Sequence, residues 1–306
     1  MTASSKPICV VGSINQDLVA STPRIPAPGE TILGSDFASF AGGKGGNQAY
    51  AAARLGAPTR MIGAVGEDSF GETLSAGLTA AGVDVSGVRR VAGPTGIAII
   101  AHAPGGENSI IVIPGANSKV SKEHLDAERK HVREAGVIMA QLEIPIETVE
   151  YLGFIAAELG IPFLLDPAPA QSLSRNLLQS VTWLTPNENE QQILLRAESP
   201  EPREAARLLL KMGVRNVALK LGPRGVYLAG ADCVPGYVPG FSVEALDTTG
   251  AGDVFNAAFA VGLIRGMQAR DAARFGSAAA AISVTRKGAQ TSAPELTEVE
   301  EFLLRR

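Results

Sequence analysis

The stretch that most constrains this chain is residues 247–253, which read DTTGAGD and lead into the apolar run 254–264. That run has the length of a helix, so Gly250, Ala251 and Gly252 fall at its entrance. The first N–H groups of a helix have no partner within it and carry partial positive charge, and small residues let a ligand approach them closely. The stretch therefore predicts an anion site, most naturally for a phosphate group.

Asp253 lies at the mouth of this predicted anion site. A carboxylate repels phosphate, but it can accept the proton of a hydroxyl group that attacks a phosphate. A loop that ends in an acidic N-cap would show the same pattern. From this stretch alone, a phosphoryl-transfer site and a simple helix cap are equally good interpretations.

The composition is that of a globular α/β protein. The 306 residues are 45% hydrophobic and include 34 glycines, which allows one large domain or two modest ones. Lys and Arg total 27 against 31 Asp and Glu, so the formal net charge is −4. This balance lacks the basic excess of a nucleic-acid-binding surface, and we expect no nucleic-acid partner.

Cysteine usage and hydropathy indicate the compartment. Cys9 and Cys233 lie far apart in or beside apolar stretches and lack metal-ligand spacing, as expected of free thiols in a reducing cytosol. The polar stretch 1–7 is followed by an apolar run too short for a signal peptide. The run 254–264 is too short to cross a bilayer. We therefore expect a cytoplasmic protein with no membrane partner.

Short apolar runs alternate with helical patterns along most of the chain. The expected strands are 8–12, 60–65, 137–143, 161–166, 181–184 and 216–221, and the expected helices are 48–55, 69–81, 146–159, 254–264 and 270–284. This alternation implies right-handed crossovers and a mostly parallel sheet covered on both faces, so we predict a three-layer, doubly wound α/β fold. Polar residues that follow the strands then share one edge of the sheet, where ligands bind in such folds.

Two further pairs of strands do not fit this alternation. The runs 95–100 and 109–113 flank a Pro- and Gly-rich turn at 104–108, which is a hairpin signal. Two more strands are expected between residues 17 and 40, the second running from Thr31 to Phe40. We predict that about 17–41 and 95–114 form a small β-sheet inserted into a single domain that spans 1–306. Such a sheet would be a lid that closes over an acceptor and excludes water.

Two segments near the N-terminus could bind a polyol. Asn15 and Asp17 follow the first strand, where amide and carboxylate groups suit vicinal hydroxyls, although an Asx-stabilised turn explains them equally well. Residues 41–49 place four glycines around Lys44, but no Ser or Thr follows the lysine as a Walker phosphate loop requires. The segment instead opens a helix, whose entrance amides and Asn47 could contact sugar hydroxyls.

The order of these motifs resembles that of the ribokinase-like sugar kinases, the PfkB family. The matching strings are GSINQD at 12–17, GGKGGN at 42–47, QLE at 141–143, DPAP at 166–169, TPNENE at 185–190, GPRG at 222–225, DTTGAGD at 247–253 and VTRKGAQ at 284–290. The match runs from about residue 8 to residue 294, and within the family it looks most like the members that phosphorylate ribose. The resemblance implies transfer of the γ-phosphoryl group of ATP to the 5-hydroxyl of D-ribose.

The resemblance also implies a role for each matching residue. The sugar would be held by Asn15, Asp17, Gly43, Lys44, Asn47, Glu143 and Asp253. Asp253 would be the catalytic base, and the amides of Gly250, Ala251 and Gly252 would stabilise the transferring group. The nucleotide would contact Asn187, Lys220, Gly222, Arg224, Gly225, Gly252 and Ser277. Pro223 stands where relatives often carry a small polar residue, so any polar contact from that position is lost.

Two metal sites follow from the same resemblance. Mg²⁺ would lie near Asn187 and Glu190, with water between because this ion keeps much of its hydration shell. The two residues alone are explained equally well as a helix-capping pair. A monovalent activator, K⁺, would lie beside the anion site, mostly on backbone carbonyls, with Asp247, Thr249, Ser283, Arg286, Gly288 and Ser292 at the matching positions. One carboxylate among neutral oxygens suits such a large, weakly hydrated ion.

Several alternatives stay open. A kinase for a related sugar or a nucleoside, such as deoxyribose, fructose or ketodeoxygluconate, would carry the same motifs. Asn15 favours a ligand with a 2-hydroxyl, because an unpaired buried amide costs on the order of 1–3 kcal/mol. A non-catalytic sugar sensor is a further alternative, but such a protein should have lost the base or the anion-site glycines. We also expect a homodimer, because apolar lid strands would otherwise expose one face and related kinases pair through their lids.

Overall fold

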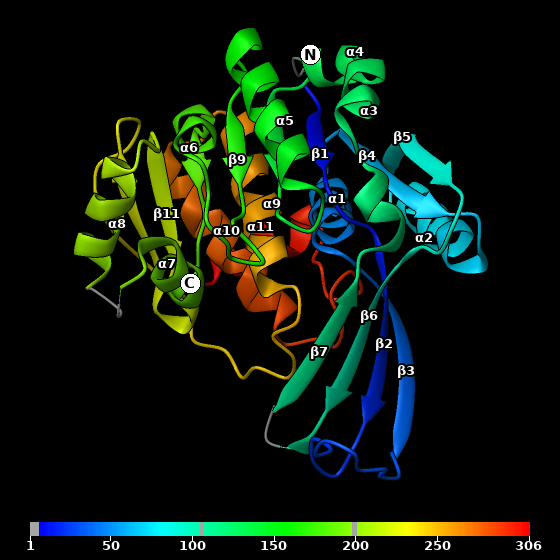
Figure 1. Ribbon diagram of the computed structural model, residues 1–306. Coiled ribbons are helices and arrows are strands. Elements are labelled where there is room, and N and C mark those ends of the chain that lie inside the picture. Colours follow the sequence, from blue (N-terminus) through cyan, green and yellow to red (C-terminus); the bar gives the residue numbers. More distant parts are fainter. Residues whose placement is uncertain (1–5, 105–106, 198–200) are drawn as a thin grey trace.

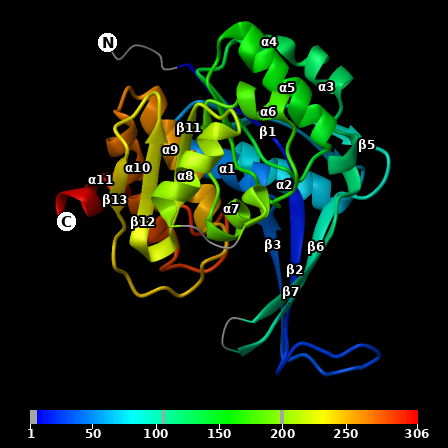
Figure 2. The same ribbon diagram turned by 60° about the vertical axis from the view of Figure 1, so that its left-hand side comes forward.

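The computed structural model describes residues 6–104, 107–197 and 201–306. Figure 1 shows an α/β body from which a small sheet projects, and the rotated view of Figure 2 shows the same projection. Residues 1–5 of the polar N-terminal stretch and Gly105 and Gly106 of the expected hairpin turn lie outside the described ranges. No described helix is both long enough and apolar enough to span a membrane.

The body is built on a nine-stranded sheet with the order β13-β12-β11-β10-β9-β8-β1-β4-β5. From β11 to β5 all neighbours pair in parallel, whereas β12 is antiparallel to both β11 and β13. The strands are β1 (Ile8–Val11), β4 (Thr59–Gly66), β5 (Val83–Val91), β8 (Val137–Ala140), β9 (Phe163–Leu165), β10 (Trp183–Leu184), β11 (Asn216–Lys220), β12 (Gly225–Gly230) and β13 (Gly236–Pro239). The predicted doubly wound, mostly parallel sheet is confirmed.

Helices cover both faces of this sheet (Figure 1). One face carries α1 (Lys44–Arg54), α2 (Ser69–Ala80), α9 (Ala251–Ile264), α10 (Ala269–Ser283) and α11 (Leu296–Leu304). The other carries α3 (Lys122–Ala127), α4 (Arg129–Arg133), α5 (Ile146–Leu159), α6 (Arg175–Ser180), α7 (Glu188–Leu195) and α8 (Pro202–Lys211). Alternate residues of β1 enter the two cores, Ile8 and Val10 on the first face and Cys9 and Val11 on the second. This alternation is expected of a strand buried on both sides.

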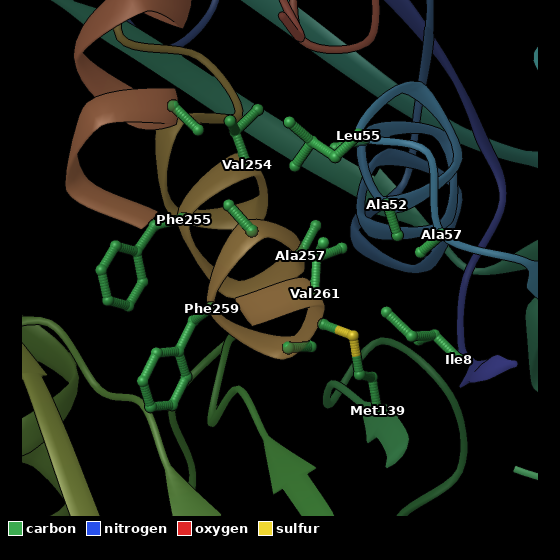
Figure 3. Close-up of a cluster of buried hydrophobic side chains, with 14 of the residues drawn as sticks. Ile8, Ala52, Leu55, Ala57, Met139, Val254, Phe255, Ala257, Phe259 and Val261 are labelled. Atoms are coloured by element: carbon green, nitrogen blue, oxygen red, sulfur yellow. The ribbon is translucent and has the colours of Figure 1, made fainter. Parts of the chain in front are cut away.

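Helix α9 lies at the centre of the first core (Figure 3). Phe259 makes an edge contact with Trp183 of β10, with ring centroids 4.9 Å apart, and stacks on Phe255 at 5.9 Å. Val261, on another side of the helix, points toward Met139 of β8. These contacts fix α9 against the sheet, so packing along the helix contributes to the position of its first turn.

The small sheet has the order β3-β2-β6-β7. Its strands are β2 (Asn15–Ser21), β3 (Asp36–Gly42), β6 (Gly96–His102) and β7 (Asn108–Ile113). β6 and β7 pair antiparallel, as the hairpin pattern predicts, and β2 is parallel to β6 and antiparallel to β3. β2 follows β1 after three residues, and β3 leads directly into α1. The base of the small sheet therefore adjoins the predicted sugar-binding segments.

The structure corrects two expected boundaries near this junction. The strand expected from Thr31 begins only at Asp36, because its partner β2 ends at Ser21, which pairs with Asp36. Helix α1 begins at Lys44 rather than at Gln48. The glycine-rich segment is thus the first turn of the helix itself, which is why its glycines can lie inside the site.

Other differences concern strand ends and sheet edges. The strand expected over 137–143 ends at Ala140, so Glu143 lies beyond it, and several other expected strand ends shift by one or two residues. The edge strands β5 and β13, and β12 beside β13, were not identified from sequence. An edge strand is half solvated and lacks the continuous apolar run that marks a central parallel strand. Two short 3-10 turns, η2 (Gly115–Lys119) and η3 (Gly222–Arg224), complete the described elements.

Candidate active site

The first turn of α1 packs directly on the loop that follows β1. A Cβ atom added to Gly45 would stand 2.7 Å from backbone atoms of Gly12 and Ser13, so only glycine permits this approach. The backbone N–H of Gly46 donates to the carbonyl of Ser13 at 2.8 Å. This contact brings Lys44 to the carboxyl edge of the sheet.

Glu143 is held at the same junction. Its Oε2 accepts hydrogen bonds from the Ser13 hydroxyl at 2.5 Å and from the backbone N–H of Lys44 at 3.0 Å. Glu143 thus meets the entrance of α1 although β8 ends before it. Ser13 was not among the predicted site residues, and its role is to orient this carboxylate.

Asn15 is the first residue of β2 and is buried. Its Oδ1 accepts a hydrogen bond from Nδ2 of Asn117 at 2.7 Å, and Oδ1 of Asn117 accepts one from the backbone N–H of Ile14 at 2.9 Å. The alternative of an Asx-stabilised turn is wrong, because Asn15 lies in a paired strand. Asn117, which sequence reasoning missed, fixes the orientation of the Asn15 amide.

Asp17 is the third residue of β2, an inner strand of the small sheet, where it pairs with Phe40 of β3 and Ala98 of β6. Burial, together with the negative charges of Glu143 and Asp253, raises the pKa of Asp17 to about 7, against an opposing effect of Lys44. A carboxyl group in this position is a strong acceptor for ligand hydroxyls once it is ionised. Its charge changes within the physiological pH range.

Asp253 lies in the first turn of α9 and is 5% exposed. Its Oδ2 accepts from Nδ2 of Asn47 at 3.0 Å, and its Oδ1 accepts from Nε2 of Gln48 at 3.0 Å. Burial raises the pKa of Asp253, and among its neighbours Lys44 lowers it, Asp166 raises it and the two amide hydrogen bonds lower it. A buried carboxylate with a raised pKa is suited to accept a proton from a hydroxyl group.

The cap of α9 decides between the two interpretations of residues 247–253. The N-cap is Gly250, whose φ of 74° lies in the left-handed region. Among the residues that the structure describes, no side chain makes a capping hydrogen bond at this helix start. Asp253 instead bonds to side chains of α1. The interpretation as a simple acidic N-cap is therefore wrong. The backbone N–H of Ala251 donates to the carbonyl of Thr248 at 3.2 Å, and the small residues at the start of α9 leave room for an anion near its N-terminus.

A cavity of ≈ 420 Å³ opens beside this turn. Its wall is largely apolar, with Val226, Phe241 and Phe255 among the lining residues. Of the predicted nucleotide-binding residues, the lining contains Lys220, Gly222, Gly225, Gly252 and Ser277. An apolar cavity with a few polar groups, next to a helix N-terminus, fits a purine base with a phosphate chain.

Arg224 and Asn187, the other two predicted nucleotide-binding residues, do not line the cavity. Pro223 lines the cavity, where it adds apolar wall rather than a hydrogen-bonding group. The guanidinium of Arg224 pairs with Glu188 at the surface. Asn187 caps helix α7. The structure therefore gathers most of the predicted set at the cavity and gives Arg224 and Asn187 partners of their own.

Asn187 and Glu190 form a capping box at the start of α7. Oδ1 of Asn187 accepts from the backbone N–H of Glu190 at 2.8 Å, while the Glu190 carboxylate accepts from the backbone N–H of Asn187 at 2.7 Å and from its Nδ2 at 2.8 Å. The capping interpretation is thus confirmed. Burial raises the pKa of Glu190, with Lys220 lowering it and Asp166 raising it. Because both carboxylate oxygens already accept hydrogen bonds, these residues fit a metal ion held through water.

Asp166 connects the cavity wall to Asp253. Its Oδ1 accepts from Nζ of Lys220 at 2.9 Å, and its Oδ2 accepts from Nε2 of Gln48 at 3.2 Å. Asp166 belongs to a motif seen in the sequence, but no role was predicted for it. Gln48 was assigned only to the helix. Both were missed because their significance depends on contacts between distant segments.

The predicted monovalent cation site is a pair of linked loops. Asp247 accepts from the backbone N–H of Thr249 at 2.9 Å and from that of Gly288 at 2.8 Å. Burial would raise the pKa of Asp247, but these hydrogen bonds outweigh it and lower the pKa. Ser283 and Ser292 donate to backbone carbonyls of their own turns. The carboxylate thus stays charged and ties residues 247–253 to the loop around Gly288.

The donor set of these loops agrees with a backbone-liganded cation. Across residues 6–104, 107–197 and 201–306, no group of three or more His, Cys, Asp or Glu side chains is placed to hold a metal ion. The Arg286 guanidinium pairs with Glu298, so the group of Arg286 that could bind a cation is its backbone carbonyl. One ionised carboxylate and several carbonyls fit a monovalent ion better than a divalent one.

Residues 5–296 match the model of the pfkB family carbohydrate kinases. The chain belongs to this family. It is 41% identical over 304 residues to ribokinase of Haemophilus influenzae, covering 97% of this chain and 98% of the relative. It is 35% identical over 301 residues to deoxyribokinase of Salmonella typhimurium, covering 97% and 98%. The structure of Arabidopsis thaliana ribokinase complexed with ribose and ATP matches with a TM-score of 0.90 and 35% identity, covering 98% of this chain and 99% of that one. The family that the motif order implies is thus confirmed.

We expect Asp17 to make sugar use by this carbohydrate kinase dependent on pH. Because its pKa is raised to about 7, the carboxylate that accepts hydroxyl hydrogens forms as the pH rises through that value. We expect kcat/KM for the sugar to rise about tenfold between about pH 6 and pH 8. Initial rates of ADP release at subsaturating sugar measure this.

The variant Asp17→Asn should weaken sugar use at every pH and reduce the rise between about pH 6 and pH 8 to the part that comes from the proposed base, Asp253. Asp36→Asn is the matched control, because Asp36 is exposed at the far end of the same sheet. A flat wild-type profile, or an Asp17→Asn profile that keeps the full rise, would contradict the assignment.

Proposed function

We propose that this protein transfers the γ-phosphoryl group of ATP to O5 of D-ribose, giving D-ribose 5-phosphate and ADP. The observation that carries the proposal is the place of Asp253, a buried carboxylate held by two amides of α1 beside the glycine entrance of α9. Ribose and ATP are bound in the Arabidopsis ribokinase structure that this fold matches. Membership of a carbohydrate kinase family supports the same reaction class.

The sugar would lie between β2 and the start of α1. Asn15, Asp17 and Glu143 offer amide and carboxylate groups to its hydroxyls, and Gly43, Lys44 and Asn47 border the same space from α1. The small sheet would act as a lid over this site, because β2 contains Asn15 and Asp17 and β3 leads directly to Gly43 and Lys44. Closing the lid would exclude water, which competes with the sugar for the phosphoryl group.

The chemistry would be performed at the first turn of α9. Asp253 would accept the proton of the 5-hydroxyl as its oxygen attacks phosphorus, so that the new O–P bond forms while the bond to ADP breaks. The N–H groups of Gly250, Ala251 and Gly252 would stabilise charge on the transferring group. Burial alone would lower the pKa of Lys44, but the charges of Asp253, Asp166, Glu143 and Glu190 raise it, so Lys44 stays a cation.

The nucleotide would occupy the cavity beside that turn. Lys220, Gly222, Gly225, Gly252 and Ser277 line it, with Pro223 as part of the apolar wall. Arg224 and Asn187 would act at its rim. Mg²⁺ held through water near Asn187 and Glu190 would neutralise charge on the phosphate chain.

Asp253→Asn tests the proposed base. We expect kcat to fall by roughly 10²- to 10⁴-fold while ribose still binds, because the amide keeps the shape but cannot take the proton. ADP release measures the rate, and calorimetric titration measures ribose binding. Asp271→Asn is the control, because Asp271 lies exposed in the first turn of α10. An Asp253→Asn protein with near wild-type turnover would overturn the proposal.

Deoxyribose phosphorylation is the second candidate, because a deoxyribokinase is among the relatives. Asn15 favours ribose, because its amide is buried and held by Asn117, and a sugar without the 2-hydroxyl would leave a polar group of this amide unpaired. Turnover in the same assay should therefore be roughly tenfold to a hundredfold better for ribose than for 2-deoxyribose. Equal turnover of the two sugars would refute the role given to Asn15.

We also propose K⁺ as an activator at the loops joined by Asp247, with Thr249, Ser283, Arg286, Gly288 and Ser292 around it. The ion would hold the loop that leads into α9 without touching substrate. Replacing K⁺ by choline should lower kcat about fivefold or more, and Asp247→Asn should remove the response. An enzyme equally active in choline would exclude the site. Asp36→Asn again serves as the control.

We propose a homodimer formed through the lid. Strand β7 is exposed along its whole length, and Ile110, Ile111 and Val112 are between 45% and 61% exposed, with Phe37 of β3 at 66%. An exposed apolar edge strand is usually covered by another chain or segment, and we propose that a second copy of this chain covers β7. Sedimentation at micromolar concentration should show a dimer, and Ile111→Asp should give a monomer. Leu304→Asp, at an exposed position near the end of α11, should leave the dimer intact. A wild-type monomer would contradict this.

We place the protein in the cytoplasm. Its two cysteines, Cys9 and Cys233, are free, and burial raises the pKa of the Cys9 thiol to about 12, against a lowering effect of Arg60. Free thiols of this kind suit a reducing compartment.

A further inference from the structure

We propose that Gln48 is a positioning residue for phosphoryl transfer, which holds the Asp253 carboxylate and keeps it apart from the carboxylate of Asp166. This inference rests on the proposed function, in which Asp253 is the base. It adds a residue that touches neither sugar nor nucleotide in that proposal. The reason lies in how one side-chain amide is shared.

The Gln48 amide stands between two carboxylates. Its Nε2 donates to Oδ1 of Asp253 at 3.0 Å and to Oδ2 of Asp166 at 3.2 Å. An amide NH₂ group has two hydrogens, so each carboxylate receives one. Gln48 and Asp166 are at most 1% exposed, and Asp253 is 5% exposed. Without this donor, two buried carboxylates would face each other, which strongly disfavours ionisation of both.

The orientation of this amide is fixed from behind. Oε1 of Gln48 accepts from Nε2 of Gln141 at 2.6 Å. A flipped Gln48 amide would turn its oxygen toward the two carboxylates and its NH₂ toward the Gln141 donor, so both ends oppose the flip. Gln141 is itself fully buried. Gln141 and Gln48 therefore hold one N–H donor in a fixed direction toward Asp253. This fixes the orientation of the carboxylate that is to accept a proton from the substrate.

The second carboxylate is neutralised separately. Oδ1 of Asp166 pairs with Nζ of Lys220 at 2.9 Å, and Lys220 lines the cavity. A chain of hydrogen bonds thus runs from Gln141 through Gln48 and Asp166 to Lys220, with Asp253 attached at Gln48. Lys44 is then the positive charge that acts on Asp253.

The charges around Asp253 give the sign of the effect. Lys44 faces it from α1, Asp166 from beyond β9 and Asp17 from β2. Lys44 lowers the pKa of Asp253 and Asp166 raises it, and the hydrogen bonds from Asn47 and Gln48 lower it. Removing the Gln48 donor takes away one lowering contribution. The base should then stay protonated to higher pH.

Gln48→Met tests the role, because methionine keeps the unbranched shape and removes the amide. We expect kcat to fall about tenfold to a hundredfold with little change in KM for ribose. The acid limb of the kcat profile should move up by about one pH unit. Gln141→Leu, which frees the Gln48 amide, should give a smaller shift in the same direction and serves if Gln48→Met does not fold.

Thr148→Val is the matched control, because Thr148 on α5 is a buried residue whose hydroxyl donates to the carbonyl of Val120 and to neither of the two carboxylates. It should lower the melting temperature without moving the pH profile. The proposal is overturned if Gln48→Met and Gln141→Leu both keep the wild-type profile, or if they lose activity only in step with melting temperature, as the control does. Failure of the proposed function would appear separately, as a wild-type protein that releases no ADP with ribose or an Asp253→Asn variant that remains active.

Discussion

The structure depends on the burial of one carboxylate. Asp253 is 5% exposed, and a charge in such a place is tolerated only when donors and a counter-charge surround it. Two donors come from Asn47 and Gln48 near the start of α1, and the counter-charge comes from Lys44, the first residue of that helix. Helices α1 and α9 must therefore meet at their N-termini. Two positive helix ends near one carboxylate also favour anions there.

That meeting explains why glycine is needed at both helix entrances. Gly250 caps α9 in a left-handed conformation, and Gly45 lets α1 lie on the backbone of the loop after β1. Larger residues would move either helix outward and take the amide groups away from the carboxylate. The glycines are thus part of the same constraint as the charge, because the donors reach Asp253 only when both turns pack closely.

The sequence predicted those parts of the site whose chemistry is local. Asp253, Gly250 and Asn47 lie in short motifs whose residue types predict a helix start with a polar group beside it. The alternation of apolar runs predicted the parallel sheet. Gln48 and Ser13 were missed because their roles consist of hydrogen bonds to segments far away in the chain, Gln48 to Asp253 and Ser13 to Glu143. A side chain that orients another one leaves no periodic pattern. The half-solvated edge strands were missed for a related reason, since burial on one side only leaves a mixed pattern.

The capping box at α7 shows that a structural and a functional interpretation need not compete. Asn187 and Glu190 satisfy each other's backbone groups and thereby start the helix. The same bonds hold the Glu190 carboxylate toward Lys220 and Asp166, whose charges act on its pKa. In the proposed reaction, a carboxylate fixed in this way would have its remaining lone pairs available to the water molecules around Mg²⁺. Stabilising the helix and offering an acceptor to a hydrated cation would then be two consequences of one arrangement.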